Sequence, residues 1–337
     1  MELEITRFEQ SGTKERNLGM ELVRVTEAAA LSAGRWMGKG NKEMVDQAAV
    51  DAMRSALDGV DMSGVVVIGE GEKDEAPMLY IGEQVGNGSA PEVDVAVDPV
   101  DGTRLLSLGL PGALAVVATA ERGSMYSAPP GVFYMEKIAV GPTFKNVIDI
   151  NAPVAFNLDR IARARDAHID DIAVVVLDRP RHQELIRQIR EVGARIRLIS
   201  DGDVAAAIQA AMDEYTGIDV LMGIGGAPEA VLAAAALKCL DGEIQCKIWP
   251  RNEQEREKLK GEGIDLDRVY RTEDLVKTDD VSFAATGITT GDMLDGVQYF
   301  GWGARTSSIM MRSHSGTVRY IQARHRWRKG QRRKFTL

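Results

Sequence analysis

Residues 93–106, VDVAVDPVDGTRLL, place two aspartates three residues apart directly after an apolar run. The Val and Ala residues predict a buried strand, and the Asp98-Pro99 pair indicates that the strand leaves the core there. Asp-Pro and Asp-Gly also occur in ordinary chain reversals, because Asp side chains bond nearby backbone N–H groups. The stretch is therefore either a plain turn or a strand end that brings Asp98 and Asp101 to one place.

Composition limits the classes of protein that this chain can represent. Its 337 residues are 45% hydrophobic, which is enough to bury the core of one large α/β unit or two medium domains. The formal net charge of −9 argues against nucleic acid or an anionic membrane as the main partner, and it suits a cation-binding site. Two cysteines without a C-x-x-C pair and a start without an apolar signal segment predict a cytoplasmic protein.

The pattern of polar and apolar residues predicts four parts. Residues 1–18 are polar and form an expected flexible arm, and residues 326–337 form a basic tail. Between them we expect an N-terminal α/β part, residues 19–155, that carries the metal site. A C-terminal α/β part, residues 156–325, is expected to carry the sugar and distal-phosphate contacts.

Hydrophobic periodicity predicts two helices first, at residues 20–36 and from the Asn41 cap to residue 57. A strand at 65–68, a helix-like segment at 78–85 and a strand at 93–97 follow. Runs at 112–120, 137–142 and 147–150 predict a largely antiparallel meander. After a polar helical stretch, strands at 172–177, 195–199 and 219–221 alternate with helices at 182–192, 204–212 and 229–240, the last reached through glycines.

Acidic residues recur where strands end or helices begin. Divalent cations such as Mg²⁺ prefer oxygen ligands, and Asp46, the GEGEKDE loop, the pair Asp98 and Asp101, and Glu229 offer them. Each has a simpler explanation when taken alone. Asp46 and Glu229 fit first-turn acids that the helix dipole favours, and the loop fits a solvated charged segment. Their co-occurrence favours one metal site.

The motifs GEGE at Glu70 and DPVDGT at Asp98 resemble the signature of the lithium-sensitive, metal-dependent sugar and inositol phosphatases. With FYMEKIAVGP, RPRH, ISDGDVAAAI and GIGGAPEAVLAAAAL, the sequence is similar to the class II fructose-1,6-bisphosphatases from about Met20 to about His325. The resemblance implies an α/β fold with mixed sheets in α-β-α-β-α layers. It also implies hydrolysis of the 1-phosphate of fructose 1,6-bisphosphate with Mg²⁺ or Mn²⁺, and a homo-oligomer, dimer or tetramer.

Site residues follow from the resemblance position by position. The implied metal ligands are Asp46, Glu70, Asp98, Asp101 and Glu229, with Asp98 as the expected bridging ligand. The implied substrate contacts are Asp101, Gly102, Thr103, Tyr134, Arg179, Pro180, Arg181, Asp201, Gly202, Asp203 and Gly226.

Roles within this set are expectations. Asp98, Glu70 and Thr103 are the expected catalytic residues, and Thr103 would orient or deprotonate the attacking water. Its alternative role is to cap a helix that begins at Arg104. Arg179 and Arg181 would grip the distal phosphate, and Asp201, Asp203 and Tyr134 would bond the sugar hydroxyls.

Several other readings remain open from sequence. Sedoheptulose 1,7-bisphosphate differs from the fructose substrate by one hydroxymethylene, and an inositol monophosphatase or a non-catalytic sugar-phosphate sensor are more distant alternatives. The glycines of GIGGAP are too few for a dinucleotide fingerprint. His182 could be a general base, although a structural role is more common for a histidine that opens a helix. The basic tail could bind nucleic acid or contact a neighbouring subunit.

Overall fold

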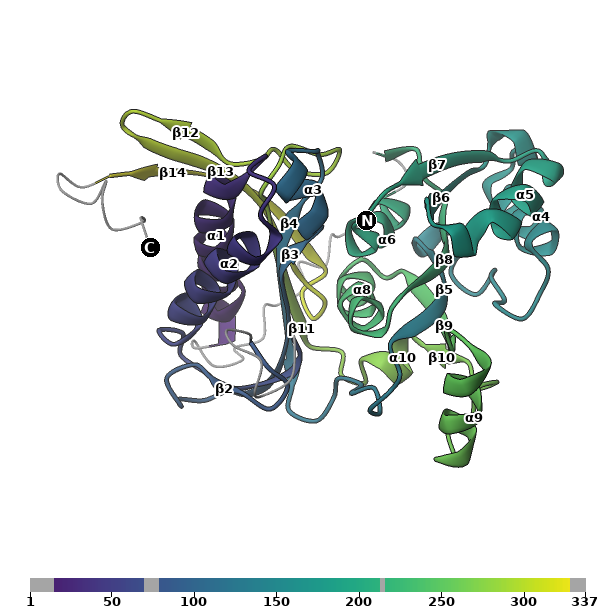
Figure 1. Cartoon of the computed structure of the whole chain (residues 1–337), viewed down its shortest axis with the longest axis horizontal. Helices are drawn as coiled ribbons and strands as arrows, with labels where there is room; N and C mark the ends of the chain where they lie inside the picture. The colour runs from purple at the N-terminus through teal and green to yellow at the C-terminus, as the bar shows by residue number, and fades with distance from the viewer. Residues whose placement is uncertain (1–14, 70–78, 213–215, 328–337) are drawn as a thin grey trace, which may run out of the picture.

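The computed structural model describes residues 15–69, 79–212 and 216–327. Two β-sheets stand face to face, with helices between them and on both outer faces (Figure 1). Glu70, Glu72, residues 1–14 of the predicted arm and residues 328–337 of the basic tail lie outside the described residues.

The first sheet has eight strands in the order β12-β13-β11-β4-β3-β1-β2, with β14 also paired to β13. Its neighbouring strands are antiparallel except β1 and β3, which are parallel. The strands are β1 (Ser63–Ile68), β2 (Gln84–Val85), β3 (Glu92–Asp101), β4 (Leu114–Glu121), β11 (Val281–Gly287), β12 (Gln298–Phe300), β13 (Gly303–Arg312) and β14 (Thr317–Arg326).

The second sheet has six strands in the order β10-β9-β5-β8-β6-β7. It is mixed, because β6 runs parallel to β7 and β8 while β5 runs antiparallel to β8 and β9. The strands are β5 (Tyr134–Val140), β6 (Ala173–Leu177), β7 (Arg195–Ile199), β8 (Val220–Gly226), β9 (Glu243–Ile248) and β10 (Tyr270–Arg271).

Three separate clusters of buried side chains place the helices in layers. One cluster joins α1 (Glu15–Ala33) and α2 (Lys42–Leu57) to the outer face of the first sheet. A second joins both sheets to α6 (Asp203–Ala211) and α8 (Ala227–Cys239), and a third joins α4 (Val154–Arg165) and α5 (Gln183–Val192) to the far face of the second sheet. The order is helix, sheet, helix, sheet, helix, so the predicted α-β-α-β-α fold is confirmed.

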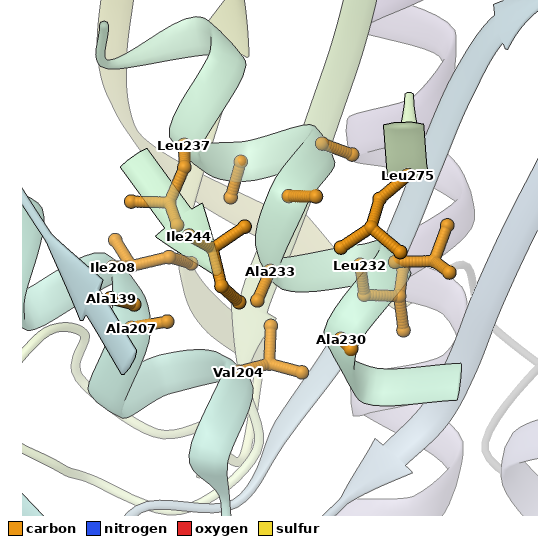
Figure 2. Close-up of a cluster of buried hydrophobic side chains, with 14 of the residues drawn as sticks. Ala139, Val204, Ala207, Ile208, Ala230, Leu232, Ala233, Leu237, Ile244 and Leu275 are labelled. Carbon is orange, nitrogen blue, oxygen red and sulfur yellow. The ribbon is translucent and has the colours of Figure 1, made fainter. Parts of the chain in front are cut away.

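The central helix layer is buried on all sides, which explains its composition. Every residue of α6 is buried, and α8 carries a run of four alanines at 233–236 with no polar face toward solvent in its middle turns. A helix that is apolar all round packs inside a protein rather than on its surface. Figure 2 shows Val204 and Ile208 of α6 beside Ala233 and Leu237 of α8, with Ala139 of β5 at the same contact. The alanines let both sheets approach closely.

Shorter helices complete the fold. They are α3 (Thr103–Leu108), α9 (Glu253–Gly261) and α10 (Thr272–Leu275), together with the 3₁₀ turns η1 (Gly34–Trp36), η2 (Pro142–Phe144), η3 (Ile169–Asp171) and η4 (Pro180–His182).

Most predicted elements are confirmed. The Asn41 side chain caps α2 by accepting a bond from Met44 N at 3.0 Å, and the strand predicted at 195–199 is β7. Helix α1 begins at Glu15 rather than at Met20, so residues 15–18 of the predicted arm are helical. The glycines after residue 221 belong to β8 itself, which runs to Gly226.

Two predicted elements are wrong. Residues 79–85 do not form a helix: Val66 N donates to Glu83 O and Gly82 N to Val66 O, so the segment lies along β1 as an irregular edge. Residues 147–150 do not form a strand. The Gln245 side chain accepts from Ile150 N at 2.9 Å, so a side chain replaces the sheet partner that the apolar residues had suggested.

The predicted meander is also wrong in its connections. β4 pairs with β3 and β11 in the first sheet, whereas β5 lies between β8 and β9 in the second. The pairing is antiparallel as predicted, but the chain changes sheets between β4 and β5. This crossing places the end of β3 and the start of β5 on opposite sides of the central helices.

Candidate active site

The end of β3 and the start of α3 form the first side of the site. The register of β3 against β4 shifts between Asp98 and Asp101, so the chain bulges where the two aspartates stand. Asp98 Oδ1 accepts a bond from Val100 N at 3.1 Å, which is the turn chemistry that the sequence suggested. The bulge redirects Asp101 into the interior, where only 5% of the residue is exposed.

Thr103 connects this strand end to α2. Its hydroxyl donates to Asp46 Oδ1 at 2.7 Å, with a second contact to Val100 O at 3.3 Å. Burial raises the pKa of Asp46, and the Thr103 bond partly offsets that rise. Helix α3 begins at Thr103 itself with Gly102 as the N-cap residue, so the alternative that Thr103 caps a helix from Arg104 is wrong. The Thr103 hydroxyl instead donates its hydrogen bond to the Asp46 carboxylate.

Carboxylates from both halves of the chain converge on Asp101. Burial, followed by the negative charges of Asp203 and Glu229, raises the pKa of Asp101 well above its ordinary value. Burial and Asp203 also raise the pKa of Glu229. A methyl group at Gly202 would lie 3.7 Å from Asp101 Oδ2, so the β7–α6 loop reaches the β3 end. The structure thus brings together acids that are more than 100 residues apart.

Two oxygens in this cluster have no partner. Asp101 Oδ2 and Glu229 Oε2 are buried, and no group in the described residues donates a hydrogen bond to either. A buried anionic oxygen without a partner carries the full cost of its lost hydration, so such atoms call for a cation. In the described part of the chain no three His, Cys, Asp or Glu side chains form a complete metal site, and Glu70 lies outside it. The donor set nevertheless fits a hard cation, because every member is a carboxylate.

A buried ion pair lies beside these acids in the second sheet. Lys137 Nζ of β5 donates to Asp203 Oδ2 at 2.6 Å, and the two residues are 3% and 7% exposed. Burial lowers the pKa of Lys137, but the charges of Asp203 and Glu229 outweigh burial and raise it. Lys137 therefore stays charged and fixes Asp203 at the start of α6.

The glycines at the end of β8 make room for this arrangement. A methyl group at Gly225 would lie 1.8 Å from Asp203 Oδ2, and one at Gly226 would lie 1.9 Å from Glu229 Oε2. Both separations are far below a van der Waals contact, so any larger residue at these positions would displace the two carboxylates from where they lie. The glycines of GIGGAP serve close approach to acids rather than to a dinucleotide phosphate.

Arginines occupy the rim of the second sheet. Asp201 forms ion pairs with Arg179 and, at 3.3 Å, with Arg104 of α3, which links the two halves of the chain. Arg181 donates twice to Ile224 O, at 2.8 Å and 3.1 Å, and its guanidinium lies 5.1 Å from the centre of the Tyr134 ring. Burial lowers the pKa of Arg181, although the group remains a cation. Predicted phosphate and sugar contacts therefore lie together, on the rim next to the acids.

His182 is a structural residue. Its ring is fully buried, with Nδ1 2.7 Å from Leu177 O and Nε2 2.7 Å from the donating Ile224 N. These bonds fix a neutral ring with the proton on Nδ1, and burial lowers its pKa. Neither ring nitrogen is available to a substrate, so the general-base reading of His182 is wrong.

A cavity of about 600 Å³ opens beside the rim. Asp201 and Gly202 line it from the second sheet, and Pro111, Gly112 and Thr290 line it from the first. Arg197 and Asp292, which form an ion pair with each other, also line it. The cavity is large enough for a phosphorylated sugar, and it lies where the two sheets approach each other.

Comparison with known proteins agrees with this geometry. A family model described as bacterial fructose-1,6-bisphosphatase, glpX-encoded, matches residues 16–325. This chain belongs to that family. It is therefore a member of a family of phosphoric monoester hydrolases, as the motifs around Glu70 and Asp98 implied.

Named relatives of the family are similar over nearly the whole chain. Proteins from two Synechococcus strains are 46% identical over 336 residues, which is 92% of this chain and 96% of the relative. One from Thermosynechococcus vestitus is 45% identical over 334 residues, 91% of this chain and 95% of its own. All three are named D-fructose 1,6-bisphosphatase class 2/sedoheptulose 1,7-bisphosphatase. A solved structure, an extragenic suppressor from Pyrococcus furiosus, is 13% identical with a TM-score of 0.29, over 58% of this chain and 70% of that one.

In this member of the bisphosphatase family, sequence motifs missed two charged residues of the site. Lys137 is the one cation of β5 and is followed by three apolar residues, and that placement is the signal that could have found it. Arg104 carried no signal, because its partner Asp201 is 97 residues away. In the part of the chain that the structure describes, no helix combines the length and hydrophobicity that a membrane span requires.

Proposed function

We propose that this protein hydrolyses the 1-phosphate of fructose 1,6-bisphosphate, with Mg²⁺ or Mn²⁺, to fructose 6-phosphate and inorganic phosphate. The observation that carries the proposal is the pair of buried, unpartnered oxygens on Asp101 and Glu229 beside a rim of arginines. The site thus places carboxylate oxygens that need a metal cation next to arginines that can bind a phosphate group. Family membership supports the same reaction.

The metal would be held by Asp46, Asp98, Asp101, Glu229 and Glu70, the last outside the described residues. Bound there, Mg²⁺ or Mn²⁺ would neutralise phosphoryl oxygens and lower the pKa of a bound water. We assign Asp98 to the bridging position because it stands at the bulge of a rigid strand.

Thr103 has a specific role in this scheme. Its hydroxyl donates to Asp46, which holds that carboxylate in one orientation and leaves a lone pair of the Thr103 oxygen to accept a hydrogen bond from a water. Thr103 would then orient the attacking water against the 1-phosphate. The backbone of Gly102 and the start of α3 would approach the same phosphate.

The second sheet would hold the rest of the substrate. Asp203, fixed by Lys137, and Asp201, fixed by two arginines, present carboxylates of set geometry for sugar hydroxyls. Arg179 and Arg181 would bond the distal phosphate, with Tyr134 beside Arg181. Pro180, Gly202 and Gly226 would contribute backbone to the same surface.

Release of inorganic phosphate tests the proposal. We would measure kcat/KM for fructose 1,6-bisphosphate, sedoheptulose 1,7-bisphosphate and an inositol monophosphate, in titrations of Mg²⁺ and Mn²⁺ and with a chelator. We expect metal-dependent release from the bisphosphates, and a kcat/KM for the inositol substrate lower by about a hundredfold or more because the distal arginines gain no partner. Binding of the bisphosphate without release would instead identify a sensor.

Sedoheptulose 1,7-bisphosphate is the second candidate substrate. The cavity extends from Asp201 and Gly202 to residues 110–112. A sugar that is one carbon longer than fructose could therefore be accommodated beyond the rim. The names of the relatives carry both activities. We infer that one site hydrolyses both, and comparable kcat/KM values would support this.

The setting of the enzyme is also a proposal. Cys239 and Cys246 are free and buried, and burial raises the pKa of each thiol to about 12, which fits a reducing cytoplasm. The acidic overall charge fits a small anionic substrate held by a metal rather than a nucleic acid partner. We also infer a homo-oligomer.

A further inference from the structure

Arg104 follows directly after the residues that we assign to the metal and to the reacting phosphate. It is the second residue of α3, next to Thr103 and three residues after Asp101. Residues 105–107 of the helix are buried, whereas the Arg104 side chain is 43% exposed. The guanidinium therefore lies on the side of α3 that is turned away from the hydrophobic core.

The bond that Arg104 makes to the second half of the chain is single and long. Arg104 Nη1 donates to Asp201 Oδ2 at 3.3 Å, and its guanidinium has no other hydrogen bond or ion pair in the described chain. A guanidinium carries several N–H donors in one rigid plane, so a single bond leaves most of them available. Such a group can keep one partner and bind a second anion at the same time.

Asp201 is shared between two arginines. Its Oδ1 accepts a bond from Arg179 and its Oδ2 accepts the bond from Arg104, and neither arginine has another ion pair in the described chain. A third guanidinium lies close by, because burial lowers the pKa of Arg181 and the positive charge of Arg179 lowers it further. Arg181 bonds a backbone carbonyl rather than an acid. The rim thus carries more positive charge than its paired acid neutralises, which suits a phosphate dianion.

Arg104 lies close to the acids that would hold the metal. A methyl group at Gly202, the neighbour of Asp201, would lie 3.7 Å from Asp101 Oδ2. That Asp101 oxygen is one of the buried oxygens without a hydrogen-bond partner in the described chain. The carboxylate that Arg104 contacts is therefore one residue away from the contact with a proposed metal ligand. A phosphoryl group bound between the acids and the rim would lie beside the Arg104 guanidinium.

We propose that Arg104 is a further catalytic residue, which donates hydrogen bonds to the 1-phosphate during hydrolysis while it stays bonded to Asp201. The inference rests on the proposed function. In that reaction the oxygen of water bonds to phosphorus, the bond from phosphorus to the sugar oxygen breaks, and the sugar oxygen gains a proton as the water loses one. A guanidinium that is already in place stabilises the negative charge on the phosphoryl oxygens in the transition state.

The second partner of Arg104 gives this contact a further consequence. Asp201 is an expected contact of the sugar hydroxyls, and the planar guanidinium would hold Asp201 with one N–H and the phosphate with others. The position of the sugar would then be coupled to the position of the phosphate. A lysine has no such planar set of donors, so it would replace the charge of Arg104 without replacing this geometry.

A purely structural role for Arg104 makes a different prediction. If the pair with Asp201 only connects the two halves of the chain, Arg104→Gln and Asp201→Asn should have the same effect on the binding of inorganic phosphate. If Arg104 binds phosphate, Arg104→Gln should weaken that binding about tenfold or more. Asp201→Asn should bind phosphate as tightly as the wild type or more tightly, because it releases two arginines from their carboxylate.

Steady-state release of phosphate from fructose 1,6-bisphosphate tests the catalytic role. Arg104→Gln should lower kcat about a hundredfold with a smaller change in KM, because the lost contact strengthens in the transition state. Arg104→Lys should recover only part of the activity. The matched control is Arg271→Gln, which should keep the kcat of the wild type. Arg271 is 55% exposed in its side chain and pairs with Glu243 at 3.1 Å. Glu243 lies opposite Val140, at the end of β5 that is remote from Tyr134.

Isothermal titration of inorganic phosphate into the Mn²⁺-loaded protein measures the binding, and urea denaturation checks that each variant is folded. A wild-type kcat in Arg104→Gln would overturn the role of Arg104, and so would equal weakening of phosphate binding in Arg104→Gln and Asp201→Asn. A wild type that binds phosphate but releases none from the bisphosphate would contradict the proposed hydrolysis alone, and the titration would still decide whether Arg104 binds phosphate. A wild type that neither binds nor releases phosphate would overturn both.

Discussion

The carboxylates at the ends of the two sheets lie in different electrostatic surroundings. At the end of the first, Asp101 has an oxygen with no hydrogen-bond partner in the described chain, and Asp46 accepts a hydrogen bond from the Thr103 hydroxyl. At the edge of the second, Asp203 has Lys137 and Asp201 has Arg104 and Arg179. The acids at the first sheet need a cation, whereas those at the second sheet, apart from Glu229 at the start of α8, are already neutralised. We infer that the first is built to bind metal and the second to orient the sugar.

The largest expected effect comes from removing charge on the first side. Asp101→Asn should lower kcat about a thousandfold, since several kcal/mol of charge stabilisation is lost at the reacting phosphate. The same change should leave the metal-free protein as stable as the wild type or more so, because it removes repulsion from Asp203 and Glu229. Steady-state phosphate release and urea denaturation with a chelator would measure both. A variant that loses activity only because it is destabilised would contradict this account.

At the second sheet, removing the charge of Lys137 should lower the free energy of unfolding. Lys137→Met leaves Asp203 buried without its cation, and breaking a buried pair in this way costs about 3–5 kcal/mol of unfolding free energy. Urea denaturation would measure the loss. The double variant with Asp203→Leu should recover much of it, because neither member of the pair then leaves a buried charge without its partner. If Lys137→Met unfolds at the same urea concentration as the wild type, the pair does not hold this side together.

A smaller loss of activity is expected when the hydrogen bond between Thr103, just after the end of β3, and Asp46 of α2 is removed. Thr103→Val keeps the shape and removes the bond to Asp46, and kcat should fall about a hundredfold at saturating metal. Thr103→Ser keeps the hydroxyl and should retain most of the activity. Activity of the valine variant near that of the wild type would restrict Thr103 to packing.

The smallest effect is a pH dependence of stability from His182. Its folded pKa is below the unfolded value of about 6.5, so above that pH the ring is neutral in both states and contributes its full stability. As pH falls below about 6.5 the unfolded chain takes up the proton first, and stability is lost down to the folded pKa. Denaturation at a series of pH values should show a shallower slope in this window for His182→Asn. Equal slopes for the wild type and His182→Asn would mean that the His182 ring does not cause the loss of stability between these two pKa values.

The comparison also shows what the sequence could predict. The candidate metal ligands could be found because Asp98 and Asp101 share one strand end, and because Asp46 and Glu229 lie near the starts of helices. Asp46 is one turn further along α2 than the sequence suggested, because the first turn of that helix holds Glu43. The alternation of strands and helices after residue 172 was equally readable, because its apolar runs and glycines are local.

The second side depends on contacts that no local pattern records. Lys137 meets Asp203 across 66 residues, and Arg104 meets Asp201 across 97. The prediction of a strand at residues 147–150 is wrong for a related reason. Their apolar side chains do pack inward, but their backbone forms hydrogen bonds with distant side chains such as Gln245 rather than with a neighbouring strand. Periodicity reports which residues are buried, and it does not report what bonds the backbone beside them.

Binding of Mn²⁺, followed by isothermal titration or by its electron paramagnetic resonance signal, tests the central claim that the two halves of the chain share one metal site. Asp101→Asn changes the end of the first sheet, and Glu229→Gln changes the helix that follows the second. The account predicts that each substitution alone weakens Mn²⁺ binding about a hundredfold or more while the variant stays folded. Wild-type affinity in either variant would show that the carboxylate from that half does not belong to the metal site.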